Sequence, residues 1–140
     1  MANLVVTSSY GPAVDLEQAK RIAAGAVAEA HRNNWRVVIA IVDTHGFLTY
    51  YERMDDTQTA SATVAIEKAR TAAMFRRPTK MFEEGIAGGR MALLGMPGAL
   101  PIEGGLPIVV NGKVIGGIGV SGLTSVQDAQ VAQAGLDSLK

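Results

Sequence analysis

The chain of 140 residues contains no cysteine and only two histidines, His31 and His45. Without cysteine it cannot form a disulfide, a thiolate nucleophile, a zinc–thiolate site or an iron–sulfur cluster. Two histidines are too few for a histidine-rich metal cage, and we predict no bare metal site. Thirteen basic side chains are balanced by thirteen acidic ones, for a formal net charge of zero. This balance gives no support to a nucleic-acid partner, which normally requires a basic excess.

Long hydrophobic runs are also missing from the chain. No stretch approaches the roughly 20 apolar residues that a membrane-spanning helix needs. Residues 1–7 lack the basic segment and apolar run of a signal peptide. Apolar residues nevertheless make up 48% of the chain, enough for a sizeable core. We therefore expect one cytoplasmic domain over residues 1–140, without a membrane partner.

Hydrophobic periodicity predicts an α+β fold. Apolar residues at steps of three and four from Leu16 define one helical face, with Asp15 as its N-cap. Asn111-Gly112 between two apolar runs is typical of a tight hairpin turn. The expected strands are 4–6, 35–43, 47–53, 107–110 and 113–120, and the expected helices are 16–33, 57–77, 79–84 and 125–139. Two hairpins separated by helices favour an antiparallel sheet with helices packed on it.

Gly117, Gly119 and Gly122 form a literal G-x-G-x-x-G pattern between a predicted strand and the last predicted helix. This pattern can mark a dinucleotide phosphate loop. Only 18 residues follow Gly122, so the chain has no room for the returning strand and the acidic residue of that fold. We interpret the glycines instead as positions where backbone or ligand approaches a strand closely.

Several charged residues have both a structural and a functional interpretation. Ser125 and Asp128 have the spacing of a capping box, so Asp128 is expected to serve the N-terminus of the last helix. Lys68 lies among alanines, and it either reaches into an interface or cleft or keeps its ammonium group in water. Arg76 either complements a helix C-terminus or clamps a carboxylate. Glu103, on a glycine-bearing loop, is either an acid–base group or solvent-exposed.

The histidines and methionines are the candidate ligands for a cofactor. His31 is expected late on a helix and His45 in a hairpin turn, and a neutral imidazole at either position can hold a metal. The structural alternative is an ordinary polar residue. The methionines at positions 74, 81, 91 and 96 are typical of core filling, although with Phe75 and Phe82 they could line an apolar pocket.

An ordered set of motifs from about residue 16 onward resembles the GlcG/HbpS-like family. The resemblance implies a profilin-like α+β fold with an antiparallel five-stranded sheet flanked by helices, and homo-oligomers from dimers upward. The motifs that carry it are Asn33-Asn34-Trp35, Asp43-Thr44-His45-Gly46, Arg53-Met54-Asp55-Asp56, Lys68-Ala69-Arg70-Thr71-Ala72, Arg76-Arg77-Pro78-Thr79-Lys80, Glu103-Gly104-Gly105-Leu106-Pro107 and residues 115–128.

Members of this family include a protein encoded with glycolate-utilisation genes, haem-binding sensors, a corrinoid adenosyltransferase domain and lyases acting on hydroxylaminobenzoates. The resemblance therefore first implies a small-molecule binding domain for haem or a related flat aromatic or tetrapyrrole ligand. His31 is then the first candidate axial ligand, followed by His45 and the methionines.

The alternative is a cofactor-independent lyase that releases ammonia from a small aromatic carboxylate such as hydroxylaminobenzoate. This reaction needs a cation for the carboxylate and an acid for N–O cleavage. Arg53, Lys68 or Arg76 would supply the cation, and Glu103 or Asp43 the acid. Within the family motifs, Thr79, Gly104 and Gly105 are the further candidate substrate-binding residues.

A third possibility is an accessory homo-oligomer without its own chemistry. The alanine-rich helical faces would then form the subunit interfaces, because small side chains permit close approach of helices.

Overall fold

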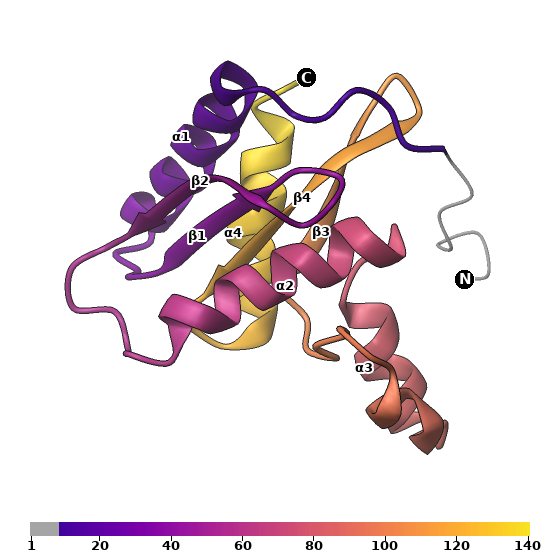
Figure 1. Cartoon of the computed structure of the whole chain (residues 1–140). Coiled ribbons are helices and arrows are strands. Elements are labelled where there is room, and N and C mark those ends of the chain that lie inside the picture. Colours follow the sequence, from indigo (N-terminus) through magenta and orange to yellow (C-terminus); the bar gives the residue numbers. More distant parts are fainter. Residues whose placement is uncertain (1–8) are drawn as a thin grey trace.

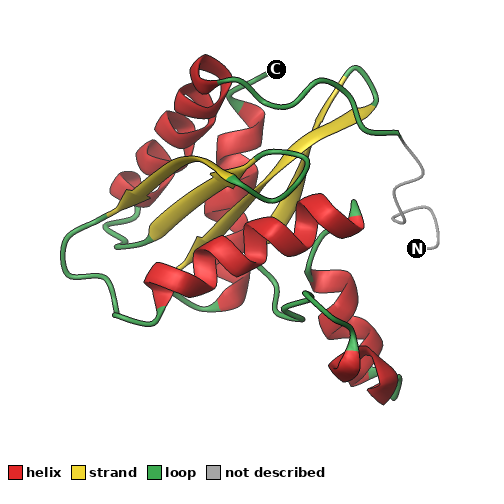
Figure 2. Cartoon of the chain, in the orientation of Figure 1, coloured by secondary structure: helices red, strands yellow, loops and turns green. Residues whose placement is uncertain are grey.

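The computed structural model describes residues 9–140, which form a four-stranded antiparallel sheet with helices on both faces (Figures 1 and 2). The strand order across the sheet is β2-β1-β4-β3. Along the chain the elements are α1 (Leu16–Arg32), β1 (Val38–Val42), β2 (Leu48–Arg53), α2 (Ser61–Phe75), α3 (Lys80–Ala87), the 3₁₀ helix η2 (Met91–Gly95), β3 (Gly105–Val110), β4 (Lys113–Ser121) and α4 (Ser125–Asp137).

The predicted α+β class and antiparallel sheet are confirmed, but the expectation of five strands is wrong for the described residues. The strand predicted at 4–6 lies outside them. At the start of the described chain, Tyr10 forms only an isolated bridge to Val114. The segment predicted as one long loop, residues 85–105, contains the end of α3 and the whole of η2.

The two faces of the sheet carry different cores. Helices α1 and α4 cover one face, where isoleucine and valine side chains such as Ile39, Ile41 and Ile118 form the larger apolar cluster. Helix α2 covers the other face, where Val38 and Val42 pack with alanines. Strand β1 is buried along its whole length because alternate residues enter the two clusters.

Glycines of β4 allow α2 to lie unusually close to the sheet. A Cβ atom on Gly117 would lie 2.4 Å from the carbonyl oxygen of Ala69, and one on Gly119 would lie 2.0 Å from that of Ala65. The interpretation of this motif as a place of close backbone approach is confirmed. Because Ala65 and Ala69 are buried within the chain, the idea that the alanine-rich face of α2 forms a subunit interface is wrong.

Helices α3 and η2, with the loop that follows them, project from the body of the molecule (Figure 1). We call residues 80–102 the arm. Phe82 anchors its base through an edge-to-face contact with Phe75, with ring centroids 5.2 Å apart. No helix within residues 9–140 has the length and hydropathy needed to cross a membrane.

Candidate functional site

Lys68 is buried and forms an ion pair inside the molecule. Its ammonium nitrogen donates to Oδ2 of Asp128 and to the carbonyl oxygen of Val120, both at 3.0 Å. Only 2% of the Lys68 side chain is exposed. The side chain therefore does not keep its charge in water, and in this structure it joins α2, β4 and α4.

Asp128 does not form the capping box predicted with Ser125. The N-cap of α4 is Thr124, whose hydroxyl accepts from the backbone N–H of Gln127, while the Gln127 side chain accepts from the N–H of Thr124. Asp128 instead accepts from Leu123 N–H through Oδ1 at 3.0 Å. Burial raises the pKa of the Asp128 carboxyl above its ordinary value, and the charge of Lys68 opposes part of that rise.

Four of the predicted site residues lie together around this pair: Lys68, Thr79, Gly104 and Gly105. A Cβ atom on Gly104, whose φ is +133°, would lie 2.6 Å from the Lys68 ammonium nitrogen. The Thr79 hydroxyl accepts from Gly105 N–H at 2.9 Å, and Thr79 N–H donates to the Gly105 carbonyl at 3.0 Å. Glu103 adjoins the cluster, and its N–H donates to the Glu83 carboxylate. The backbone at Gly104 and Gly105 therefore packs directly against Lys68.

Asp43 and His45 lie in the β1–β2 turn, where Arg70 of α2 donates to the Gly46 carbonyl at 3.2 Å. Oδ1 of Asp43 accepts from the backbone N–H groups of His45, at 2.8 Å, and Phe47, at 3.1 Å, so it stabilises the turn. The His45 side chain is exposed. Arg76 ends α2 in a left-handed conformation, and its guanidinium carbon lies 5.1 Å from the centroid of the Tyr10 ring.

His31 and Arg53 are brought together at a hollow of about 550 Å³. The hollow lies where the end of α1, the loop into β1 and the end of β2 meet. Its lining residues are His31, Asn34, Trp35, Arg36, Arg53, Met54 and Asp55. His31, predicted as a cofactor ligand, and Arg53, predicted to bind a carboxylate, thus share one site although they come from separate parts of the sequence.

Local hydrogen bonds position the walls of this hollow. Asn34 reverses the chain after α1 with a φ of +59°, and Trp35 N–H then donates to the carbonyl of Ala30 at 2.8 Å. A guanidinium nitrogen of Arg36 donates to the backbone carbonyl of Asp55 at 2.9 Å. The segment after β2 is therefore tied to the segment before β1, and the hollow is part of the folded framework.

The hollow combines three kinds of chemistry. His31 offers an exposed imidazole, Trp35 and Met54 offer half-buried apolar surface, and Arg53 offers an exposed guanidinium. Imidazole nitrogen is a common axial ligand of haem iron, and guanidinium groups bind carboxylates. Trp35, Arg36 and Met54 were not predicted as site residues. The signal for them was their place in the family motifs: Trp35 belongs to Asn33–Trp35, Met54 belongs to Arg53–Asp56, and Arg36 directly follows Trp35.

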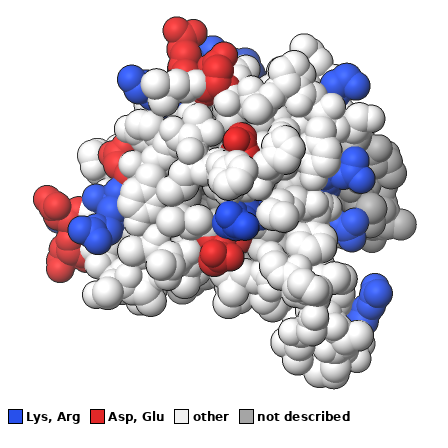
Figure 3. Space-filling view, viewed as in Figure 1, with Lys and Arg blue, Asp and Glu red and all other residues white. Residues whose placement is uncertain are grey.

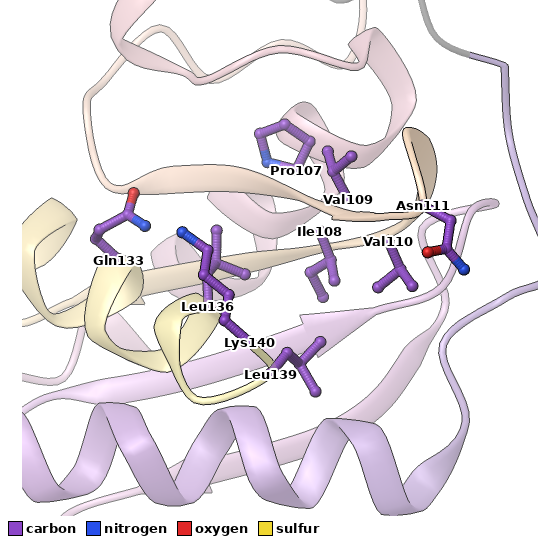
Figure 4. Close-up of a pocket in the computed structure, with 9 residues that line it drawn as sticks. All are labelled: Pro107, Ile108, Val109, Val110, Asn111, Gln133, Leu136, Leu139 and Lys140. Carbon is purple, nitrogen blue, oxygen red and sulfur yellow. The ribbon is translucent and has the colours of Figure 1, made fainter.

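A second concave surface lies between β3 and α4, with a volume of about 410 Å³ (Figure 4). Ile108 and Val110 point from β3 toward the C-terminal part of α4, whereas Pro107 and Val109 point to the opposite side of the strand. The groove contains none of the predicted site residues and has no imidazole. It is therefore less suited to haem than the hollow at His31.

Comparison with known proteins decides the family. The family model described as haem-degrading protein HbpS-like matches residues 14–137. The chain belongs to the HbpS-like family. This HbpS-like chain is 49% identical to GlcG of Escherichia coli K12 over 105 residues, which cover 75% of the chain and 78% of GlcG.

Two solved structures are similar to this HbpS-like chain over most of its length. A double mutant of Streptomyces reticuli HbpS superposes with a TM-score of 0.85 at 32% identity, over 94% of this chain and 90% of HbpS. PduOC in complex with haem superposes with a TM-score of 0.80 at 29% identity, over 90% of this chain and 94% of PduOC. The predicted family is therefore confirmed, and both neighbours share its fold.

Proposed function

We propose that this HbpS-like protein binds haem, or a related flat tetrapyrrole, in the hollow lined by His31, Trp35, Arg53 and Met54. The observation that carries the proposal is the combination of an exposed imidazole with apolar side chains and a guanidinium at one hollow. Its volume of about 550 Å³ lies in the usual range of small-molecule sites, which is about 300–1,000 Å³.

Each side chain has a separate part in this proposal. His31 would hold the iron through an imidazole nitrogen, Trp35 and Met54 would contact the apolar ring system, and Arg53 would bind a propionate carboxylate. When bound, haem supplies an iron centre for redox or oxygen chemistry. Arg36 is held by the Asp55 carbonyl and keeps the wall of the hollow in place.

The relatives support haem as the ligand class. The matching family is described as haem-degrading, and PduOC has been crystallised with haem. The lyase hypothesis has no corresponding support among these relatives. Its candidate cation Lys68 is buried and paired with Asp128, and Asp43 holds two backbone N–H groups of a turn.

A haemin titration of the purified apo-protein, followed by absorption spectroscopy, tests the proposal. We expect a saturable, stoichiometric shift of the Soret band, with free haemin and an unrelated protein as controls. His31→Ala should weaken binding at least tenfold and change the spectrum. His45→Ala replaces the other histidine, which lies outside the hollow, and should leave both unchanged.

Two outcomes contradict the proposal. If the parent protein gives no specific Soret shift, haem is not its ligand. If the shift survives His31→Ala and is lost in His45→Ala, haem binds at the β1–β2 turn and the hollow is the wrong site.

A further inference from the structure

A notch of about 200 Å³ lies at the base of the arm and shares no lining residue with the hollow at His31. Its floor is apolar, because Phe82 and Leu93 are buried there. Two guanidinium groups and no carboxylate complete the lining; the lining residues are Arg77, Met81, Phe82, Gly85, Arg90 and Leu93. The notch therefore combines apolar surface with two positive charges.

Arg77 is held in place at one side of the notch. Its Nε donates to the carbonyl oxygen of Phe75 at 2.9 Å, and its guanidinium carbon lies 6.0 Å from the centroid of the Phe82 ring. An arginine side chain carries five N–H donors, and the bond to Phe75 uses only the one on Nε. In the described part of the chain no hydrogen bond involves the terminal nitrogens of Arg77, so these nitrogens can bind a ligand.

Arg90 carries the second positive charge on a fixed backbone. Its N–H donates to the Gly85 carbonyl at 2.9 Å, and its carbonyl accepts from Leu93 N–H at 3.2 Å. Its side chain is exposed and forms no ion pair with any residue that the structure describes. The carboxylate of Glu84 on α3 contacts Lys80 at 3.8 Å and does not line the notch.

The two charges favour a phosphate group over a carboxylate. Guanidinium groups match the geometry of both, but one carboxylate would balance only one of the two charges. A phosphate monoester carries a charge of about −1.5 to −2 at pH 7 and would balance both. Figure 3 shows blue atoms and no red ones on the visible face of the arm, so no acidic side chain there competes for the guanidinium groups.

The floor and the size of the notch limit the rest of the ligand. Buried apolar side chains favour an organic group over bare inorganic phosphate, because apolar surface is removed from water when such a group binds. The volume of about 200 Å³ is below the range of about 300–1,000 Å³ that is usual for drug-sized ligands. The notch therefore suits a small molecule.

We propose that the notch binds a small phosphate monoester that carries an apolar or aromatic group. The terminal N–H groups of Arg77 and the guanidinium group of Arg90 would bind the phosphate oxygens, and Phe82 and Leu93 would contact the organic group. This site is separate from the proposed haem site, because the two share no residue.

Isothermal titration calorimetry of the full chain with phenyl phosphate at neutral pH tests the ligand class. We expect saturable binding at one site per chain. Inorganic phosphate lacks the apolar group and benzoate lacks the second negative charge, so each should bind at least tenfold more weakly. Binding of phenyl phosphate should also weaken below pH 6, because the second pKa of the phosphate group is about 6.

Two arginine variants test the location. Arg90→Met removes one of the two charges and should weaken phenyl phosphate binding at least tenfold. Arg21→Met is the matched control, because Arg21 is exposed on α1 and its replacement removes the same charge far from the notch in sequence. It should bind like the parent, and circular dichroism should show that both variants are folded.

Three outcomes overturn the proposal. If the parent protein does not bind phenyl phosphate, the notch is not a site for this class. If benzoate or inorganic phosphate binds as tightly as phenyl phosphate, the site does not select a phosphate monoester. If Arg90→Met binds as tightly as the parent, the anion is held elsewhere on the molecule.

Discussion

The ammonium nitrogen of Lys68 lies 3.0 Å from Oδ2 of Asp128, and the two side chains are only 2% and 3% exposed. The pair joins the middle of α2 to the first turn of α4 across the end of β4. A buried ion pair adds little stability relative to apolar residues of similar shape, but removing one partner leaves the other charge buried and uncompensated.

Lys68→Met should therefore lower the free energy of unfolding by about 3–5 kcal/mol, as measured by urea denaturation at neutral pH. Adding Asp128→Asn should recover part of this loss, because asparagine carries no charge and can still accept from Leu123 N–H. Lys80→Met, at an exposed position, is the control. A cost below about 1 kcal/mol for Lys68→Met would show that Asp128 is not left as an uncompensated charge.

Gly119→Ala should destabilise the fold, because the new methyl group would lie 2.0 Å from the Ala65 carbonyl oxygen and 2.5 Å from the Ala69 nitrogen. The backbone of α2 must move away from the sheet, at a cost of about 3 kcal/mol or more in thermal or urea unfolding. Gly95→Ala has no heavy atom within 4 Å of its new Cβ and should change stability little. Equal effects of the two substitutions would contradict the close approach of α2.

Thr124→Ala should cost about 1 kcal/mol of unfolding free energy, because the Thr124 hydroxyl accepts from Gln127 N–H and begins α4. Ser125→Ala, one residue later, removes no capping bond and should be nearly neutral. Chemical denaturation of the two variants compares them directly. A larger loss of unfolding free energy for Ser125→Ala than for Thr124→Ala would instead support the capping box predicted at Ser125 and Asp128.

Tyr50 should ionise at higher pH than an ordinary tyrosine. Burial raises its pKa above 10.0, and the Glu52 carboxylate, which accepts from the Tyr50 hydroxyl at 3.2 Å, raises it further. The folded state therefore holds this proton more tightly than the unfolded state. The resulting stability is present below pH 10 and is lost as pH rises through the folded pKa.

Glu52→Gln should move the ionisation of Tyr50 to lower pH in a titration of tyrosinate absorbance, because it removes the neighbouring charge. Tyr50→Phe identifies which part of the curve belongs to this side chain among the three tyrosines. A Tyr50 curve that Glu52→Gln leaves in place would show that Glu52 does not influence its pKa.

Elements that depend on local signals could be predicted from the sequence. The apolar spacing and Asp15 predict α1 from residue 16, and the structure has Leu16–Arg32 with Asp15 as the N-cap. The predicted N-cap of α4, Ser125, lies one residue after the observed one, because Thr124 and Ser125 both have a suitable partner three positions later. The extended conformation of Thr124, with φ −68° and ψ 153°, selects Thr124.

The candidate sites depend on contacts between distant segments, which the sequence does not specify locally. Lys68 and Asp128 are 60 residues apart in the chain, and no pattern around either residue indicates the other. The hollow is formed by residues near His31 and near Arg53. Both segments contain family motifs, but only the fold of β1 against β2 brings His31 and Arg53 to one hollow.

The contact between Thr79 and Gly105 also has a consequence for how the protein behaves when it is concentrated. Strand β3 is an edge of the described sheet, and Thr79 occupies both the N–H and the carbonyl of Gly105. Two residues further on, Pro107 has no N–H to offer. A strand from another molecule would find few free backbone groups there, so β3 is protected against edge-to-edge aggregation. Within the described sheet, any intermolecular strand pairing should therefore begin at the opposite edge, β2.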